Sequence, residues 1–169
     1  TLRNSSAASD VYKRQVITSM RAVIQRVSQA SVLVNEEKVA SINDGLTVLL
    51  GIEIEDSKED ARWLANKISQ LRIFADKEGV MNKSIIDING EIIVVSQFTL
   101  HAKTKKGNRP SYIKAARPEI AIPLYEQFKD DLSLAIRNKV QSGEFGSDMQ
   151  VSLTNSGPVT IIIDTKDKQ

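Results

Sequence analysis

The sequence predicts an α+β fold with mainly antiparallel strands and two main helices. Several segments have apolar residues at every second position, as half-buried strands do, and turn signals rich in Asn, Asp and Gly separate them. Two longer segments instead have apolar residues at helical spacing. Because these elements do not alternate as strand, helix and strand, we do not expect a parallel α/β sheet.

Composition and length indicate one globular domain. The chain has 169 residues, of which 41% are hydrophobic and 26% charged, and it is far from the composition of a disordered chain. It has no cysteine and one histidine, His101, which excludes disulfides, a thiolate nucleophile and a multi-histidine metal site within one subunit. We expect no metal or cofactor, a cytoplasmic location and no membrane association, since no apolar run reaches the ~18 residues of a membrane span.

The two ends of the chain differ from its body. Residues 1–19 are mostly small or polar, and Met20 opens an alternating segment. We therefore expect 1–19 to be a non-native or disordered leader, 20–163 to be a single domain, and 164–169 to be a loose tail. The leader holds three of the 23 basic and one of the 21 acidic residues, so the body is neutral with 20 of each.

The first half predicts three strands and a helix. The turn residues between the strands tolerate positive φ angles. The helix begins at Ser57, whose hydroxyl can cap it, with Asp60 three residues later to complete the capping box. The expected strands are 21–34, 39–42 and 46–54, and the helix continues to about Leu71.

The second half predicts a hairpin, a second helix and two final strands. Asn89-Gly90 is a hairpin signal, and a proline is tolerated only in the first turn of a helix. The expected hairpin joins 85–88 to 91–95, the helix begins at Pro118 or Pro123 and ends near Val140, and strands 151–153 and 159–163 flank a connection at 155–158.

A polar tip, Ser96-Gln97-Phe98-Thr99-Leu100, follows the apolar run 92–95. If the strand continues, Gln97, Thr99 and His101 share one face. One hypothesis makes Thr99 a nucleophile with His101 as its base. The other is a strand end whose polar groups bond to backbone or water.

Three further features allow both a functional and a structural interpretation. Asn155-Ser156-Gly157-Pro158 is either an ordinary turn or a cis Gly157-Pro158 bond that projects two carbonyls into a pocket. The acid-free basic stretch 103–117 is either a phosphate-binding loop or a solvated loop. Phe145 and Met149 are either a stacking platform for a base or apolar filler. The basic residues that we single out are Lys103, Lys105, Lys106 and Arg109.

Taken together, these segments resemble the D-aminoacyl-tRNA deacylase family over about 145 residues, from Met20 to about Ile163. Several short sequence motifs occur in the order in which the family has them, which is stronger evidence than any single motif. They are the opening 20–27, Arg72-Ile73-Phe74, 96–100, Arg109-Pro110-Ser111, and 148–152 leading to 155–160.

The resemblance implies a barrel-like homodimer that hydrolyses the ester between a D-amino acid and the 3′ end of tRNA, and also removes glycine from mischarged tRNA. It implies a cis Gly157-Pro158 that reaches into the partner subunit's pocket and excludes L side chains. It further implies that Arg26 braces that loop. Phe145 and Met149 match positions near the terminal adenosine, and Ser96, Gln97, Phe98 and Thr99 line the ester.

The resemblance also changes the favoured mechanism. It implies that main-chain donors and the 2′-hydroxyl of the RNA carry the catalysis, with a covalent Thr99 esterase as the alternative. His101 does not match the family pattern. The expected partner is the aminoacylated 3′ end of tRNA rather than DNA.

Overall fold

One long strand, β1 (Arg21–Val34), organises the sheet of this computed structural model, which describes residues 19–168. One edge of β1 pairs antiparallel with β3 over its first half and with β2 over its second half, and the other edge pairs antiparallel with β8 along its length. β6 then pairs parallel with β3, and β7 pairs parallel with β6. The remaining sheet strands are β2 (Glu37–Ile42), β3 (Gly45–Gly51), β6 (Glu91–Ser96), β7 (Gln141–Ser142) and β8 (Met149–Asp164).

The sheet curls toward a barrel. β2 and β7 stand at opposite ends of the strand order β2-β1-β3-β6-β7, yet the Ser41 amide donates to the Gln141 side chain at 2.8 Å. Alternate residues of β6 face two different cores: Ile92 and Val94 face the helices, whereas Ile93 and Val95 face the inside of the curl. The α+β class with mainly antiparallel pairing is confirmed, and the two parallel pairings are those of β6 with β3 and with β7.

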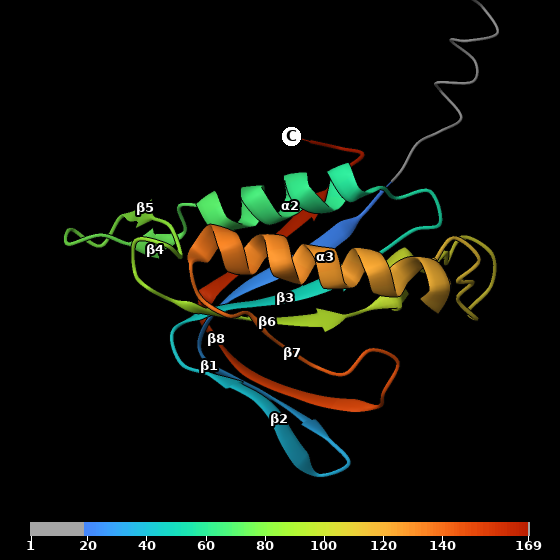
Figure 1. The fold of residues 1–169 in the computed structure, drawn as a ribbon, viewed down its shortest axis with the longest axis horizontal. Helices are drawn as coiled ribbons and strands as arrows, with labels where there is room; N and C mark the ends of the chain where they lie inside the picture. The colour runs from blue at the N-terminus through green and yellow to red at the C-terminus, as the bar shows by residue number, and fades with distance from the viewer. Residues whose placement is uncertain (1–18, 169) are drawn as a thin grey trace, which may run out of the picture.

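Two helices cover one face of the sheet and lie side by side (Figure 1). α2 (Lys58–Gln70) has the predicted capping box between Ser57 and Asp60. α3 (Pro118–Ile136) starts at Pro118, keeps Pro123 in its interior and ends at Arg137, which adopts the left-handed conformation. Each helix contributes fully buried side chains to the core: Leu64 and Ile68 from α2, and Phe128 and Leu132 from α3. Burial of each such side chain stabilises the fold by roughly 1.5–3 kcal/mol.

The predicted hairpin at 85–90 is wrong. Residues 85–89 form turns, closed by the Gly90 amide donating to the Ile85 carbonyl at 3.0 Å. The Ser84 and Asp87 side chains each accept from the other residue's amide. Short apolar runs fit a buried turn as well as a strand, so periodicity alone does not separate them. The small antiparallel pair in this region is instead β4 (Phe74–Ala75) with β5 (Met81–Lys83).

The two final strands are one strand, β8, with an excursion in its middle. Gln25 pairs with Thr160 and Val27 pairs with Asn155. Four residues, 156–159, therefore lie opposite Arg26 alone and are displaced from the ladder, as in an extended bulge.

The expected leader lies almost wholly outside the described residues. Ser19 and Met20 are buried, and the Met20 amide donates to the Thr165 hydroxyl at 2.8 Å. In the predicted tail, Thr165 is buried and residues 166–168 are exposed, with the Lys168 Nζ 4.4 Å from the centre of the Trp63 ring. Within residues 19–168, no helix has the length and apolar character needed to cross a membrane.

Candidate active site

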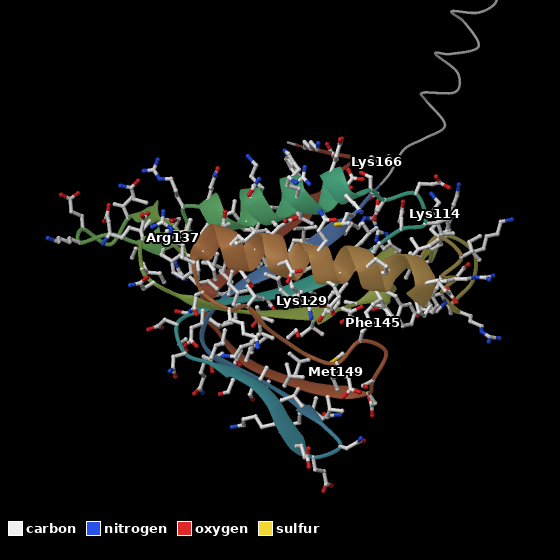
Figure 2. The ribbon with its side chains drawn as sticks, viewed as in Figure 1. Lys114, Lys129, Arg137, Phe145, Met149 and Lys166 are labelled. Atoms are coloured by element: carbon white, nitrogen blue, oxygen red, sulfur yellow. The ribbon has the colours of Figure 1, made fainter. Side chains whose placement is uncertain are left out.

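A cavity of about 450 Å³ lies where β6 ends. Its lining includes Ser96, Gln97 and Phe98 together with Phe145 and Met149. Phe145 lies on the segment that leads into β8, below α3 in the view of Figure 2, and Met149 is the first residue of β8. Five predicted site residues, far apart in sequence, thus line one pocket.

The chain leaves the sheet immediately after Ser96. The Gln97 amide donates to the Leu50 carbonyl at 2.8 Å, and residues Phe98–His101 then form a 3₁₀ helix, η1. Among residues 19–168, the amides of Phe98 and Thr99 donate to no acceptor, as expected for the first turn of a helix. The predicted alternation through Leu100 is therefore wrong, and two main-chain donors remain free beside the pocket.

Thr99 and His101 do not form a nucleophile and base pair. The Thr99 hydroxyl accepts a hydrogen bond from the Gln97 side-chain amide. The His101 side chain is fully buried, and its Nδ1 lies 3.2 Å from Glu53 Oε1. Gly51 lies against this ring, since a Cβ there would be 3.0 Å from the ring atoms. Because the 3₁₀ turn replaces the strand, the two side chains do not share one face.

The orientation of Phe145 is set by residues of α3. Its ring packs on that of Tyr125 at a centroid distance of 5.6 Å. The Tyr125 hydroxyl donates to the Val94 carbonyl at 3.2 Å, and burial raises the pKa of Tyr125 to about 12. The Lys129 Nζ lies over the Tyr125 ring, 4.6 Å from its centre. This arrangement holds an apolar ring at the wall of the pocket.

The basic stretch 103–117 reaches the pocket through residues near its end, Tyr112, Ala115 and Ala116. Lys103 and Ser111 exchange two backbone hydrogen bonds of 2.8 and 2.9 Å, which close the loop at its base. Lys105, Lys106 and Arg109 are exposed within it. Tyr112, just beyond the loop, lines the pocket and packs edge-on against Phe98 at 5.0 Å. Tyr112 was not among the predicted site residues, although an aromatic residue within a basic stretch was a usable signal.

The excursion of β8 is held from one side by Arg26. Arg26 Nε donates to the Ser156 carbonyl at 3.0 Å, and Arg26 Nη1 donates to the Ile73 carbonyl at 2.7 Å. The Gly157-Pro158 bond is cis, and Gly157 has a φ of 132°, a conformation that favours glycine. Asn155 closes the excursion by accepting from the Val159 amide at 2.9 Å.

Gly157 and Pro158 do not line the pocket of their own chain. Both are exposed, and the pocket beside the excursion is a different one, lined by Arg26, Phe74 and Ser156 among others. The predicted site residues thus do not meet at one place within a single chain. Ser96–Phe98, Phe145 and Met149 line the pocket, whereas Gly157 and Pro158 lie on the exposed excursion.

Comparison with known proteins gives a consistent pattern. Residues 23–164 match the family model described as D-Tyr-tRNA(Tyr) deacylase. The chain is 63% identical over 150 residues to a D-aminoacyl-tRNA deacylase of Bacteroides fragilis strain YCH46, and 64% identical over 150 residues to one of Flavobacterium psychrophilum; each match covers 89% of this chain and all of the relative.

Solved structures give the same architecture. A structure titled c-Myc DNA Unwinding Element Binding Protein superimposes with a TM-score of 0.80 and 41% identity, over 85% of this chain and 97% of that one. A probable eukaryotic D-amino acid tRNA deacylase superimposes with a TM-score of 0.76, over 86% of this chain and 99% of that one. At 20% identity, the second likeness shows the fold alone.

Proposed function

The chain belongs to the D-Tyr-tRNA(Tyr) deacylase family, and we propose that it hydrolyses the ester bond between a D-amino acid and the 3′ end of tRNA. One observation carries this proposal. The pocket brings polar and main-chain groups of Ser96–Phe98 together with the apolar Phe145 and Met149. Such a pocket suits an ester at one wall and a stacked adenine at the other.

The proposed chemistry uses main-chain donors. The free amides of Phe98 and Thr99 suit an oxyanion that develops when water attacks the ester carbonyl, and one such donor is worth about 3 kcal/mol. The ester C–O bond then breaks, and the leaving 3′-oxygen takes a proton with help from the neighbouring 2′-hydroxyl. Thr99, which accepts from Gln97, orders this wall rather than attacking the substrate.

The chiral gate is proposed to come from a second subunit. The excursion at Gly157 and Pro158 is exposed and firmly held by Arg26, yet it lines no part of its own active-site pocket. In a homodimer, the partner subunit's Gly157 and Pro158 would reach the pocket and exclude L side chains. Ile162, 71% exposed on β8, offers apolar surface for such an interface.

Two corollaries follow from a gate that works by shape. Glycine has no side chain to exclude, so glycine mischarged on tRNA-Ala would also be released. The activity would then be proofreading of aminoacyl-tRNA in the cytoplasm, with RNA rather than DNA as the partner.

Two alternatives predict different behaviour. A covalent Thr99 esterase would act on small esters without RNA and would not need the 2′-hydroxyl. A noncatalytic RNA-binding protein using 103–117 would bind with steep salt dependence and cleave nothing.

The deciding experiment offers the protein D-tyrosyl-tRNA and L-tyrosyl-tRNA under single-turnover conditions. We expect rapid release of D-tyrosine and retention of L-tyrosine. Equal rates for both substrates, or no release from either, would exclude the proposed function. A substrate whose terminal adenosine lacks the free 2′-hydroxyl separates the RNA-assisted route from the covalent one.

A further inference from the structure

A second, smaller cavity of about 280 Å³ lies beyond η1. Four basic residues surround it, together with the buried ring of His101. These basic residues are Arg21, Lys103, Lys114 and Lys166. None of them belongs to α2 or α3, and none lines the active-site pocket.

Backbone contacts bring these residues together from distant parts of the chain. The Ile54 amide donates to the Lys114 carbonyl at 3.3 Å. The Thr165 amide donates to the Met20 carbonyl at 3.0 Å, which places Lys166 beside the start of β1. Lys114 and Lys166 lie at the same end of the molecule in Figure 2. The cluster is thus fixed by the fold rather than by local sequence.

The balance of charge at this cavity is positive. Its acidic neighbours are engaged: Asp164 pairs with Arg21 at 2.9 Å, and Glu53 faces His101. Lys103, Lys114 and Lys166 are exposed, and within residues 19–168 they form no ion pair. Three cations therefore remain available to a ligand.

Two buried or constrained groups also point to a ligand at this place. His101 is 2% exposed; its Nδ1 faces Glu53 Oε1 at 3.2 Å, whereas its Nε2 has no hydrogen-bond partner among the described residues. Buried polar atoms normally have partners. Arg21 uses Nε for Asp164 and Nη1 for the Leu100 carbonyl, so its Nη2 is free to donate.

We propose that this cavity, formed by Arg21, His101, Lys103, Lys114 and Lys166, binds a phosphate group of the RNA substrate. The inference rests on the proposed function, because η1 forms one wall of the active-site pocket and its last residue, His101, lines this cavity. An RNA whose 3′ end occupies the pocket can therefore lay a backbone phosphate here. The site contributes to affinity and not to the chemical step.

The test compares Lys114→Gln/Lys166→Gln with a control of equal charge change, Lys77→Gln/Lys139→Gln, whose exposed lysines lie elsewhere. Affinity for uncharged tRNA is measured at several salt concentrations. KM and kcat are measured for D-tyrosyl-tRNA and for D-tyrosyl-adenosine, which carries no phosphate. Thermal unfolding midpoints check that all variants fold.

For the Lys114/Lys166 variant we expect tRNA affinity to fall about 3- to 10-fold and KM for D-tyrosyl-tRNA to rise to match, with kcat unchanged. The dependence of log affinity on log salt should become shallower by about 0.7–0.9 for each lost phosphate contact. D-tyrosyl-adenosine should be hydrolysed at the wild-type rate.

Two results would overturn the site: tRNA affinity equal to that of the control variant, or an equal loss of activity on D-tyrosyl-adenosine. If the wild-type protein binds tRNA but hydrolyses neither substrate, the proposed function fails. The binding comparison still decides the phosphate site in that case.

Discussion

Arg26 donates to the Ser156 carbonyl at 3.0 Å and so ties the excursion of β8 to the strand it faces. The same guanidinium donates to the Ile73 carbonyl at 2.7 Å. One side chain thus fixes the excursion against two separate backbone segments, and the planar fork of arginine suits that geometry better than a lysine ammonium does.

We expect Arg26→Lys to reduce discrimination more than activity. The substitution keeps the charge but loses at least one hydrogen bond from a charged group, worth about 1.5–3 kcal/mol. The ratio of D-tyrosyl-tRNA to L-tyrosyl-tRNA hydrolysis should fall at least ~10-fold, with a smaller change for the D substrate. Arg72→Lys is the control, because Arg72 also donates to a backbone carbonyl, that of Asn82. An unchanged ratio in Arg26→Lys would show that the hold of Arg26 on the excursion does not determine selectivity.

Thr99→Ala distinguishes the two mechanisms. Because the free amides of Phe98 and Thr99 survive this change, we expect the single-turnover rate to fall less than ~10-fold. A covalent route would lose several orders of magnitude. Mass spectrometry of the quenched wild-type reaction provides the second readout, and a tyrosyl adduct on Thr99 would refute the main-chain mechanism.

Sequence alone predicted those elements whose signals are local. The capping box of Ser57 and Asp60 lies within four residues, and α2 begins where it indicates. The end of β6 is different, because the Gln97 amide bonds to Leu50, a residue far away in sequence. The periodicity within 92–101 does not contain this long-range contact. The sequence therefore predicted a continuing strand where the structure has a 3₁₀ turn.

The composition of the pocket depended on topology in the same way. The Gly143 amide donates to the Val94 carbonyl at 3.2 Å, and β7 pairs parallel with β6. This pairing brings Phe145 to Ser96. The sequence predicted both residues as site candidates through the family resemblance, but their meeting in one pocket follows only from the parallel pairing.

Phe145→Leu should weaken substrate binding with little effect on the chemical step. A leucine keeps apolar contact with Tyr125 but removes the aromatic face, and stacking of a base on such a face is worth about 1–3 kcal/mol. We expect KM for D-tyrosyl-tRNA to rise roughly 5-fold or more, with kcat within about twofold. Phe74→Leu, at a buried ring away from this pocket, is the control. An equal rise in KM for the control would point to general loosening of the fold.

The raised pKa of the buried Asp56 carboxyl predicts how the stability of the fold depends on pH. Burial raises the pKa of its carboxyl to about 7, although the Glu53 amide donates to it at 2.6 Å. Because the folded state holds this proton more tightly than the unfolded state, the contribution of Asp56 to stability falls as pH rises from about 4 to about 7 and is constant above that. The stability advantage of Asp56→Asn, which is neutral at every pH, over the wild type should therefore grow between pH 5 and pH 8. We expect a gain on the order of 2 kcal/mol, allowing for remaining solvent contact. Urea unfolding at the two pH values measures it, with Asp130→Asn, at an exposed acid of α3, as the control for the loss of an acid. A difference that is the same at both pH values would show that Asp56 is ionised in the folded protein throughout this range.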